Sequence, residues 1–318
     1  MSRLLSLCAL CALIGCDDST PPPRNESHWE IEFVVAGGSH PVISPDDSAF
    51  LFLREGAGLF LWSDGHETRI TPEGLTARAD YSWSASGENF FAFSYPGAPG
   101  NGGIVVSSDG GSLAEVWDRG SAPAYVATES YLYCAGPAEV DSEAGIWQIF
   151  LPNLEKARRV QQGIAPQIFD NGALLAHLLP VAASSGGQLI VRDTRNFVPA
   201  LILDHIARFA TRPDTDRVVT EVIADSQGLA TPPRLLLSTM TGPMLTIPIV
   251  APATDPVLLR DGSVLFNSLT GDALGALEIW QNSGSTTVSD SLFDASANSA
   301  DIIYAVGPSG ISRITRRH

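Results

Sequence analysis

A repeated strand-and-turn pattern constrains the fold of this chain more than any other feature. Its clearest unit, Ser39 to Thr71, contains four short apolar strands separated by turn sequences such as Ser-Pro-Asp-Asp and Ser-Asp-Gly. The first strand of the unit recurs 40 to 47 residues apart, near Pro41, Tyr81, Pro123, Pro166, Phe209, Pro256 and Ser299. Blades of a β-propeller, each a four-stranded antiparallel sheet, repeat every 40–45 residues or so. The sequence therefore predicts an all-β, seven-bladed propeller.

The two ends of the repeat predict how the ring closes. The last unit has no sequence for a fourth strand, and an unassigned strand, 30–35 (EIEFVV), precedes the first unit. Placing that strand outermost in the last blade completes the blade and covers an exposed sheet edge. The segment 197–208 comes closest to a helical pattern, but Pro199 and the phase of the repeat favour a strand followed by a loop.

The first unit also resembles a known repeat. The pattern Pro41-x-x-Ser44-Pro45-Asp46, the strand residues that follow, and the later Ser63-Asp64-Gly65 and Arg69-Ile70-Thr71 are similar to the TolB-type, WD-repeat-like propeller repeat. The second unit keeps Trp83 and Gly87, and the later units keep only the hydrophobic rhythm. The resemblance implies a TolB-like β-propeller. It also keeps a six-bladed ring open as the alternative, because propellers of that family usually have six blades.

The N-terminal residues have the features of an export signal followed by a flexible tether. Residues 1–15 contain one basic residue and an apolar run too short to span a bilayer, which is typical of a signal peptide. The run ends Leu13-Ile14-Gly15-Cys16, which resembles the bacterial lipobox and implies lipidation of Cys16. Residues 16–28 are polar and proline-containing and fit a flexible tether, and 29–318 form the propeller domain. We therefore expect an exported, lipid-anchored protein facing the periplasm. Asp17 resembles an inner-membrane retention signal, and the outer membrane stays open.

Charge excludes one class of partner. The chain has 35 acidic and 19 basic residues, a formal net charge of −16. Such a chain repels the phosphate backbone, so nucleic acid is not expected as a partner. We expect the acyl chains to hold the protein at the membrane and an envelope protein to be its partner.

Strand alternation predicts two different faces. The short-turn face carries the turns after the first and third strands of each blade, such as 44–47, 63–65 and 260–262. The long-loop face carries the turns after the second strands and the links between blades. Because long loops on a scaffold often bind partners, we predict a partner-binding surface there, with neutral drift of the loops as the alternative. The long segments are 96–103, 136–145, 180–187, 224–233 and 269–275, and the candidate contact residues are Asn101, Glu139, Asp141, Glu143, Ser184, Asp225, Gln227 and Asp272.

Motifs for chemistry are absent from the sequence. It has no nucleophile elbow, dinucleotide-binding or phosphate-binding glycine pattern, or zinc-protease motif. Cys134 lies in an apolar string and is expected to be a buried, inert thiol, and His40, His177 and His205 are expected to be structural. No catalytic residue, metal ligand or cofactor is predicted. We favour a non-catalytic protein-binding scaffold, with a metal-dependent, lactonase-like hydrolase in the axial channel as the alternative.

Overall fold

A computed structural model of the chain describes thirteen stretches, with gaps between them. They are residues 29–84, 91–96, 102–108, 112–118, 120–126, 131–136, 145–151, 157–181, 186–240, 246–249, 252–271, 273–281 and 284–317. Nearly all regular structure in them is β-strand, with one short 3-10 turn at Asp170–Gly172. Among these residues no helix is long and apolar enough to cross a membrane. The signal peptide, Cys16 and the tether lie outside the described residues.

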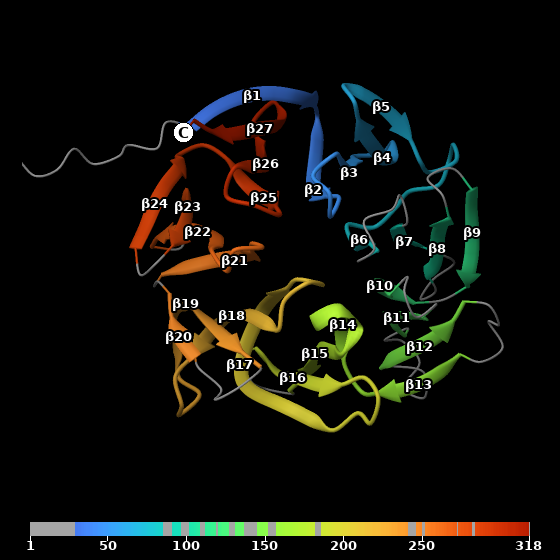
Figure 1. The fold of residues 1–318 in the computed structure, drawn as a ribbon, viewed down its shortest axis with the longest axis vertical. Helices are drawn as coiled ribbons and strands as arrows, with labels where there is room; N and C mark the ends of the chain where they lie inside the picture. Colours follow the sequence, from blue (N-terminus) through green and yellow to red (C-terminus); the bar gives the residue numbers. More distant parts are fainter. Residues whose placement is uncertain are drawn as a thin grey trace, which may run out of the picture.

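The first three sheets each contain four consecutive antiparallel strands. The first consists of β2 (Gly38–Ile43), β3 (Ala49–Arg54), β4 (Gly58–Ser63) and β5 (His66–Arg69). The second consists of β6 (Tyr81–Trp83), β7 (Phe91–Pro96), β8 (Gly102–Ser108) and β9 (Ser112–Trp117). The third consists of β10 (Ser121–Val126), β11 (Tyr131–Ala135), β12 (Ile146–Phe150) and β13 (Arg158–Gln161). Figure 1 shows these sheets side by side around a ring, with the first strand of each innermost.

The next seven strands share one hydrogen-bonded sheet. They are β14 (Ile164–Phe169), β15 (Leu174–Pro180), β16 (Gly187–Asp193), β17 (Pro199–Thr211), β18 (Arg217–Ala224), β19 (Ala230–Thr239) and β20 (Thr246–Pro248). The first half of β17 pairs with β16 and its second half pairs with β18. His205, between the halves, has a φ of 60°. The sheet is thus two four-stranded units that share β17, and the strand followed by a loop that we expected at 197–208 is one long strand passing from blade to blade.

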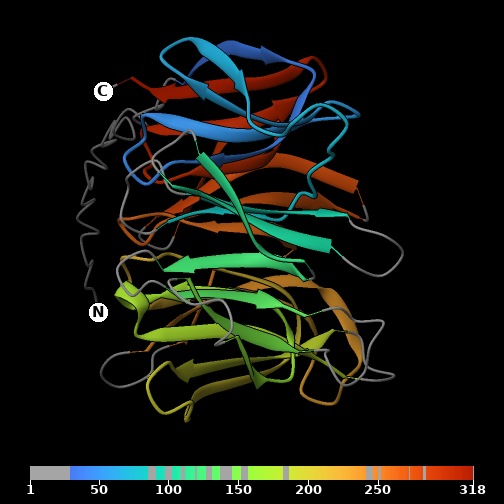
Figure 2. The same ribbon diagram turned by 90° about the vertical axis from the view of Figure 1, so that its right-hand side faces the viewer.

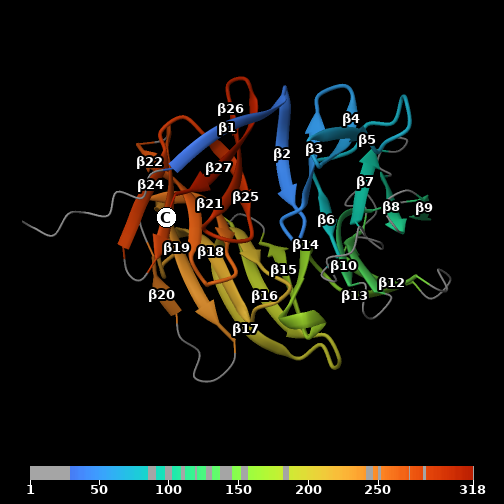
Figure 3. The ribbon, with the colours of Figure 1, turned by 45° about the horizontal axis from the view of Figure 1, so that its top comes forward.

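Two further sheets complete the ring. One consists of β21 (Ala253–Leu258), β22 (Val264–Thr270), β23 (Ala273–Gln281) and β24 (Gly284–Ser289). The last consists of β25 (Phe293–Ala297), β26 (Ile302–Gly307), β27 (Gly310–Arg316) and the N-terminal β1 (Trp29–Ala36). Strand β1 pairs antiparallel with β27, from Trp29 opposite Arg316 to Ala36 opposite Gly310. Figure 3 shows β1 along the outer edge of that sheet, as the closure expected from the sequence requires.

Apolar clusters fill the spaces between neighbouring blades. Because side chains alternate along a strand, Phe50 and Phe52 pack toward the last blade, whereas Leu51 packs toward the second. Among the described residues there are seven such clusters, each between two adjacent four-stranded units. Seven units and seven cores agree with the predicted seven-bladed ring. Figure 2 shows the ring from the side.

One expected strand start is wrong. The innermost strand of the last blade was placed near Ser299, but β25 ends at Ala297 and Ser299 follows it. The apolar run at Ile302–Val306 belongs to the second strand of that blade and set the expected phase too late. Strand β25 is short and mostly polar or small, so its hydrophobic signal is weak.

Candidate functional site: the axial cavity and the polar cluster beside it

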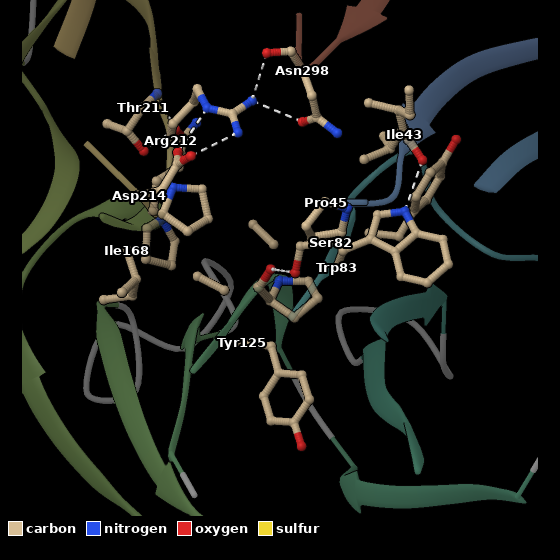
Figure 4. Close-up of a pocket in the computed structure, with 18 of the residues that line it drawn as sticks. Ile43, Pro45, Ser82, Trp83, Tyr125, Ile168, Thr211, Arg212, Asp214 and Asn298 are labelled. Atoms are coloured by element: carbon tan, nitrogen blue, oxygen red, sulfur yellow. Dashed lines mark hydrogen bonds and ion pairs between the residues drawn. The ribbon is translucent and has the colours of Figure 1, made fainter. Parts of the chain in front are cut away.

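A cavity of about 640 Å³ lies among the innermost strands. Its walls come from β2, β6, β10, β14 and β17 and from the segments that follow β2, β17, β21 and β25, so it reaches the short-turn face. Its size is within the range of about 300–1,000 Å³ that small-molecule pockets span. Figure 4 shows the side chains around it. The lining residues are Val42, Ile43, Pro45, Asp46, Asp80, Tyr81, Ser82, Trp83, Ala122, Pro123, Ala124, Tyr125, Ala165, Pro166, Gln167, Ile168, Thr211, Arg212, Pro213, Asp214, Arg260 and Asn298.

A recurrent bulge shapes these innermost strands. In five of them one residue has a left-handed backbone and the pairing register shifts around it. Such bulges twist a strand and take backbone groups out of the ladder. A proline, which has no N–H to lose, follows in four of the five strands. The left-handed residues are His40, Ala122, Ala165, Asp255 and Asp294, with φ between 47° and 53°.

Carboxylates of the preceding blade accept some of the displaced N–H groups. Asp80 Oδ2 accepts from Ala122 N at 2.8 Å, and Glu221 Oε2 accepts from Asp255 N at 3.3 Å and from Thr254 Oγ1 at 2.9 Å. Burial raises the pKa of both carboxyls, and their hydrogen bonds oppose that rise. These bonds tie neighbouring blades together around the axis.

Arg212 forms a cluster at the short-turn end of the cavity. Its side chain is only 8% exposed. Nε donates to Asp214 Oδ1 at 2.8 Å, Nη2 donates to Asp214 Oδ2 at 3.2 Å, and Nη1 donates to Asn298 Oδ1 at 2.8 Å. Since Arg212 follows β17 and Asn298 follows β25, the guanidinium joins the fifth blade to the seventh.

Asn298 and Arg260 extend this cluster to the first blade. Asn298 Nδ2 donates to the carbonyl of Ser44 and, at 3.0 Å, to Asp47 Oδ1. Arg260 Nη2 donates to the carbonyl of Pro45 at 2.9 Å, and its Nε lies 3.6 Å from Asp214 Oδ2. The cluster therefore braces the ring beside the blade that β1 closes.

Two arginines set the charge of Asp214. Its burial alone would raise the pKa, but the Arg212 hydrogen bonds and the charges of Arg212 and Arg260 hold the pKa below its usual value. Asp214 is therefore a carboxylate at neutral pH, and its charge is balanced by Arg212. Arg260, whose side chain is 55% exposed, supplies a further positive charge beside the cavity.

The described residues offer little catalytic machinery. They contain no group of three or more His, Cys, Asp and Glu side chains close enough to hold a metal ion. Cys134 is fully buried and burial raises its pKa, as the sequence predicted for an inert thiol. The hydrolase alternative is not favoured by this arrangement.

Histidines behave differently from one another. His40 is half-exposed and contacts Asp294, whose hydrogen bond raises its pKa against the effect of burial. His177 was expected to be a satisfied structural histidine, which is wrong. It is fully buried, and neither ring nitrogen has a hydrogen-bond partner of normal geometry among the described residues.

The candidate contact residues fall mostly outside the described part of the chain. Asp225 and Gln227 lie in the turn between β18 and β19. The carboxylate of Asp225 caps this turn, accepting from the backbone N–H groups of Gln227 and Leu229 at 2.9 Å each, and Gln227 is exposed. The structure therefore does not test their role. The residues outside the described part are Asn101, Glu139, Asp141, Glu143, Ser184 and Asp272.

Sequence reasoning did not single out Arg212, Arg260 or Asn298. A signal existed: Arg212-Pro213-Asp214 occupies the same place after its innermost strand as Ser44-Pro45-Asp46 after β2. An arginine in place of a turn serine, so close to the axis, is the departure that marks the cluster.

Comparison with known proteins supports the fold. The chain matches no protein family and no curated protein sequence. Among solved structures, a chain of a mitotic checkpoint complex superposes with a TM-score of 0.61 at 14% identity, covering 100% of this chain and 99% of that one. An oligogalacturonate lyase from Vibrio parahaemolyticus gives a TM-score of 0.59 at 11% identity, covering 77% and 78%. A putative TolB from Agrobacterium tumefaciens gives 0.52 at 16% identity, covering 70% and 89%. Identities this low show the fold alone, a propeller similar to those of TolB and WD40-repeat proteins.

Proposed function

We propose that this chain is a lipid-anchored, non-catalytic scaffold of the bacterial cell envelope that binds a protein partner through its long-loop face. The observation that carries the proposal is the distribution of exposed apolar side chains. Among the described residues, five large ones lie on the long-loop face, each at or directly beside the end of a strand that reaches it. They are Ile164, Val181, Leu229, Leu274 and Phe293, which are 44%, 46%, 62%, 52% and 40% exposed.

The other face differs. By the same criterion, the described residues of the short-turn face carry two large exposed apolar side chains: Val198, in the turn before β17, at 58%, and Leu113, the second residue of β9, at 37%. Exposed apolar side chains gathered on one face of a soluble domain favour a protein-binding surface. The five residues belong to blades four to seven, so the proposed surface covers that part of the long-loop face.

The path of β1 supports the same surface. Ala36 lies at the long-loop end of β27 and Trp29 lies at its short-turn end, opposite Arg316. The chain that leads to Cys16 therefore joins the domain on the short-turn side. A lipid anchor attached there leaves the long-loop face directed away from the membrane and open to a partner.

The N-terminal signal sequence supports a periplasmic position. The lipobox-like Leu13-Ile14-Gly15-Cys16 motif carries both the anchoring proposal and the proposed export to the periplasm. Replacing Cys16 tests the anchor. Cys16→Ser is expected to move the protein from the membrane fraction to the soluble fraction and to remove the mass of the acyl chains. Retention in membranes with unchanged mass would contradict lipidation.

Partner binding is tested by crosslinking in intact cells followed by purification of the protein. Leu229→Glu and Leu274→Glu place a charge on the proposed surface, and the matched control Val198→Glu places the same charge on the opposite face. We expect a discrete crosslinked envelope protein with the unmodified chain and with Val198→Glu, reduced at least tenfold by the first two changes. Equal crosslinking in all three variants would refute the role of the long-loop face.

A further inference from the structure

We propose that the axial cavity binds a small anionic amphiphile, a molecule with an apolar body and one carboxylate or similar head. Nothing in the protein-binding role requires such a site. The inference stands on three features of the cavity: its apolar wall, the polar groups around it that are already hydrogen-bonded within the protein, and one arginine that uses few of its donors within the described part of the chain.

The apolar wall comes from the first four blades. Ile43 on β2, Trp83 on β6, Ala124 on β10 and Ile168 on β14 line the cavity, together with prolines of these strands. Trp83 directs its indole N–H at the carbonyl of Val42, 2.8 Å away, which fixes the orientation of the ring. An apolar body packed on this wall gains the free energy of leaving water, about 25 cal/mol per Å² buried.

Polar side chains along the wall are already engaged within the protein. Ser82 Oγ donates to the carbonyl of Pro123 at 2.7 Å. Gln167 Oε1 accepts from the backbone N–H of Thr211 at 3.0 Å. The carboxylate of Asp80 accepts from Ser94 Oγ and from Ala122 N. An apolar ligand body in contact with these groups therefore leaves none of them without a hydrogen-bond partner.

The charge of the ligand's head follows from the Arg212 cluster, which lies opposite the apolar wall. Figure 4 shows Arg212 and Asp214 across the cavity from Ile43 and Trp83. Arg212 donates its hydrogen bonds to Asp214 and Asn298, and the ion pair of Arg212 with Asp214 has no net charge. Asp46, the remaining acid of the lining, turns its carboxylate onto its own turn, where Oδ1 accepts from Ser44 Oγ at 2.6 Å.

Arg260 is the group left to receive an anion. A guanidinium has five N–H donors. Within the described part of the chain, Arg260 contacts the carbonyl of Pro45 and, at 3.6 Å, Asp214. Its half-exposed position at the short-turn end lets a carboxylate reach the remaining donors while the apolar body enters the cavity. The charge and the remaining donors of Arg260 thus favour an anionic head at this end of the cavity, where Asp46 also stays a carboxylate.

The test uses the full-length chain with Cys16→Ser, purified without detergent, and two probes of equal length, decanoate and decyltrimethylammonium. Calorimetric titration is expected to show one decanoate bound per chain, at least tenfold more tightly than the cation. Arg260→Gln should weaken decanoate binding about tenfold, whereas Arg195→Gln, on an exposed turn of the same face outside the cavity, should leave it unchanged.

A second measurement locates the bound probe. Decanoate carrying a terminal bromine quenches indole fluorescence on contact, so it should quench the wild-type chain, and Trp83→Phe should remove that quenching. The proposal is overturned by absence of decanoate binding at millimolar concentration, by equal affinity for the cation, by unchanged affinity in Arg260→Gln, or by quenching that persists in Trp83→Phe.

Discussion

Asp80 Oδ2 accepts the backbone N–H of Ala122 at 2.8 Å, so a carboxylate of the second blade binds the innermost strand of the third. The same relation joins Asp294 to His40 N at 2.8 Å, from the last blade to the first. In both cases the N–H belongs to a residue with a left-handed backbone at the bulge. The bulge releases a donor from the sheet, and the preceding blade supplies the acceptor. The bulges therefore help to hold blades together.

Asp80→Ala is expected to lower the free energy of unfolding by about 1–3 kcal/mol, because it leaves the N–H of Ala122 without an acceptor in a half-buried site. Urea unfolding at pH 7 measures the change. Glu73→Ala, at an exposed loop position, serves as the control and is expected to change stability by less than about 0.5 kcal/mol. Equal stability of Asp80→Ala and the control would show that the bond contributes nothing to cohesion between blades.

Arg212→Ala is expected to destabilise the ring more strongly, by about 2–4 kcal/mol, since it removes the buried partner of Asp214 and Asn298 together. Asp214 is 41% exposed and can be rehydrated, which keeps the loss below that of a fully buried pair. A double-mutant cycle with Asn298→Ala isolates the link between blades five and seven. We expect a coupling free energy of about 1 kcal/mol or more, and strict additivity of the two losses would exclude that link.

The sequence repeat predicted most of the fold because each blade has the same strand-and-turn pattern. It placed Pro41, Pro123, Pro166 and Pro256 in innermost strands, and it assigned the N-terminal strand to the last blade. It failed at β25, where burial depends on neighbours contributed by other blades and few large apolar residues remain.

The sequence repeat could not predict the axial cavity or the Arg212 cluster beside it. Arg212 and Asn298 lie 86 residues apart and meet only because the ring brings the ends of two innermost strands together. A one-dimensional pattern records the phase of each residue within its blade, but not which side chains converge at the axis.

Closure of the ring by β1 gives a prediction with an internal control. Val35 is 1% exposed and packs in the cluster between the last and first blades, whereas Phe33, two residues away, is 54% exposed. Val35→Thr buries a hydroxyl and should cost about 1–3 kcal/mol of stability, and Phe33→Thr should cost less than about 0.5 kcal/mol. Urea unfolding of the two variants decides the matter. A larger loss for Phe33→Thr would contradict the described register of β1.

His177 should make the stability of the domain depend on pH. Burial lowers its pKa from 6.5 to about 4, with a further contribution from the charge of Arg192. Because the unfolded chain binds the proton first, stability is complete above pH 6.5, falls as the pH drops toward 4 and levels off below that value. The full loss from this one group is about 3 kcal/mol.

His177→Leu removes the titrating group, so the difference in unfolding free energy between wild type and variant should change by about that amount between pH 7 and pH 4. Urea unfolding at pH 7, 5.5 and 4 measures it, with His66→Leu, at the exposed start of β5, as the matched control. If the difference in unfolding free energy between wild type and His177→Leu stays constant with pH, His177 does not gain a proton on unfolding. That result would contradict a buried, neutral His177 in the folded protein.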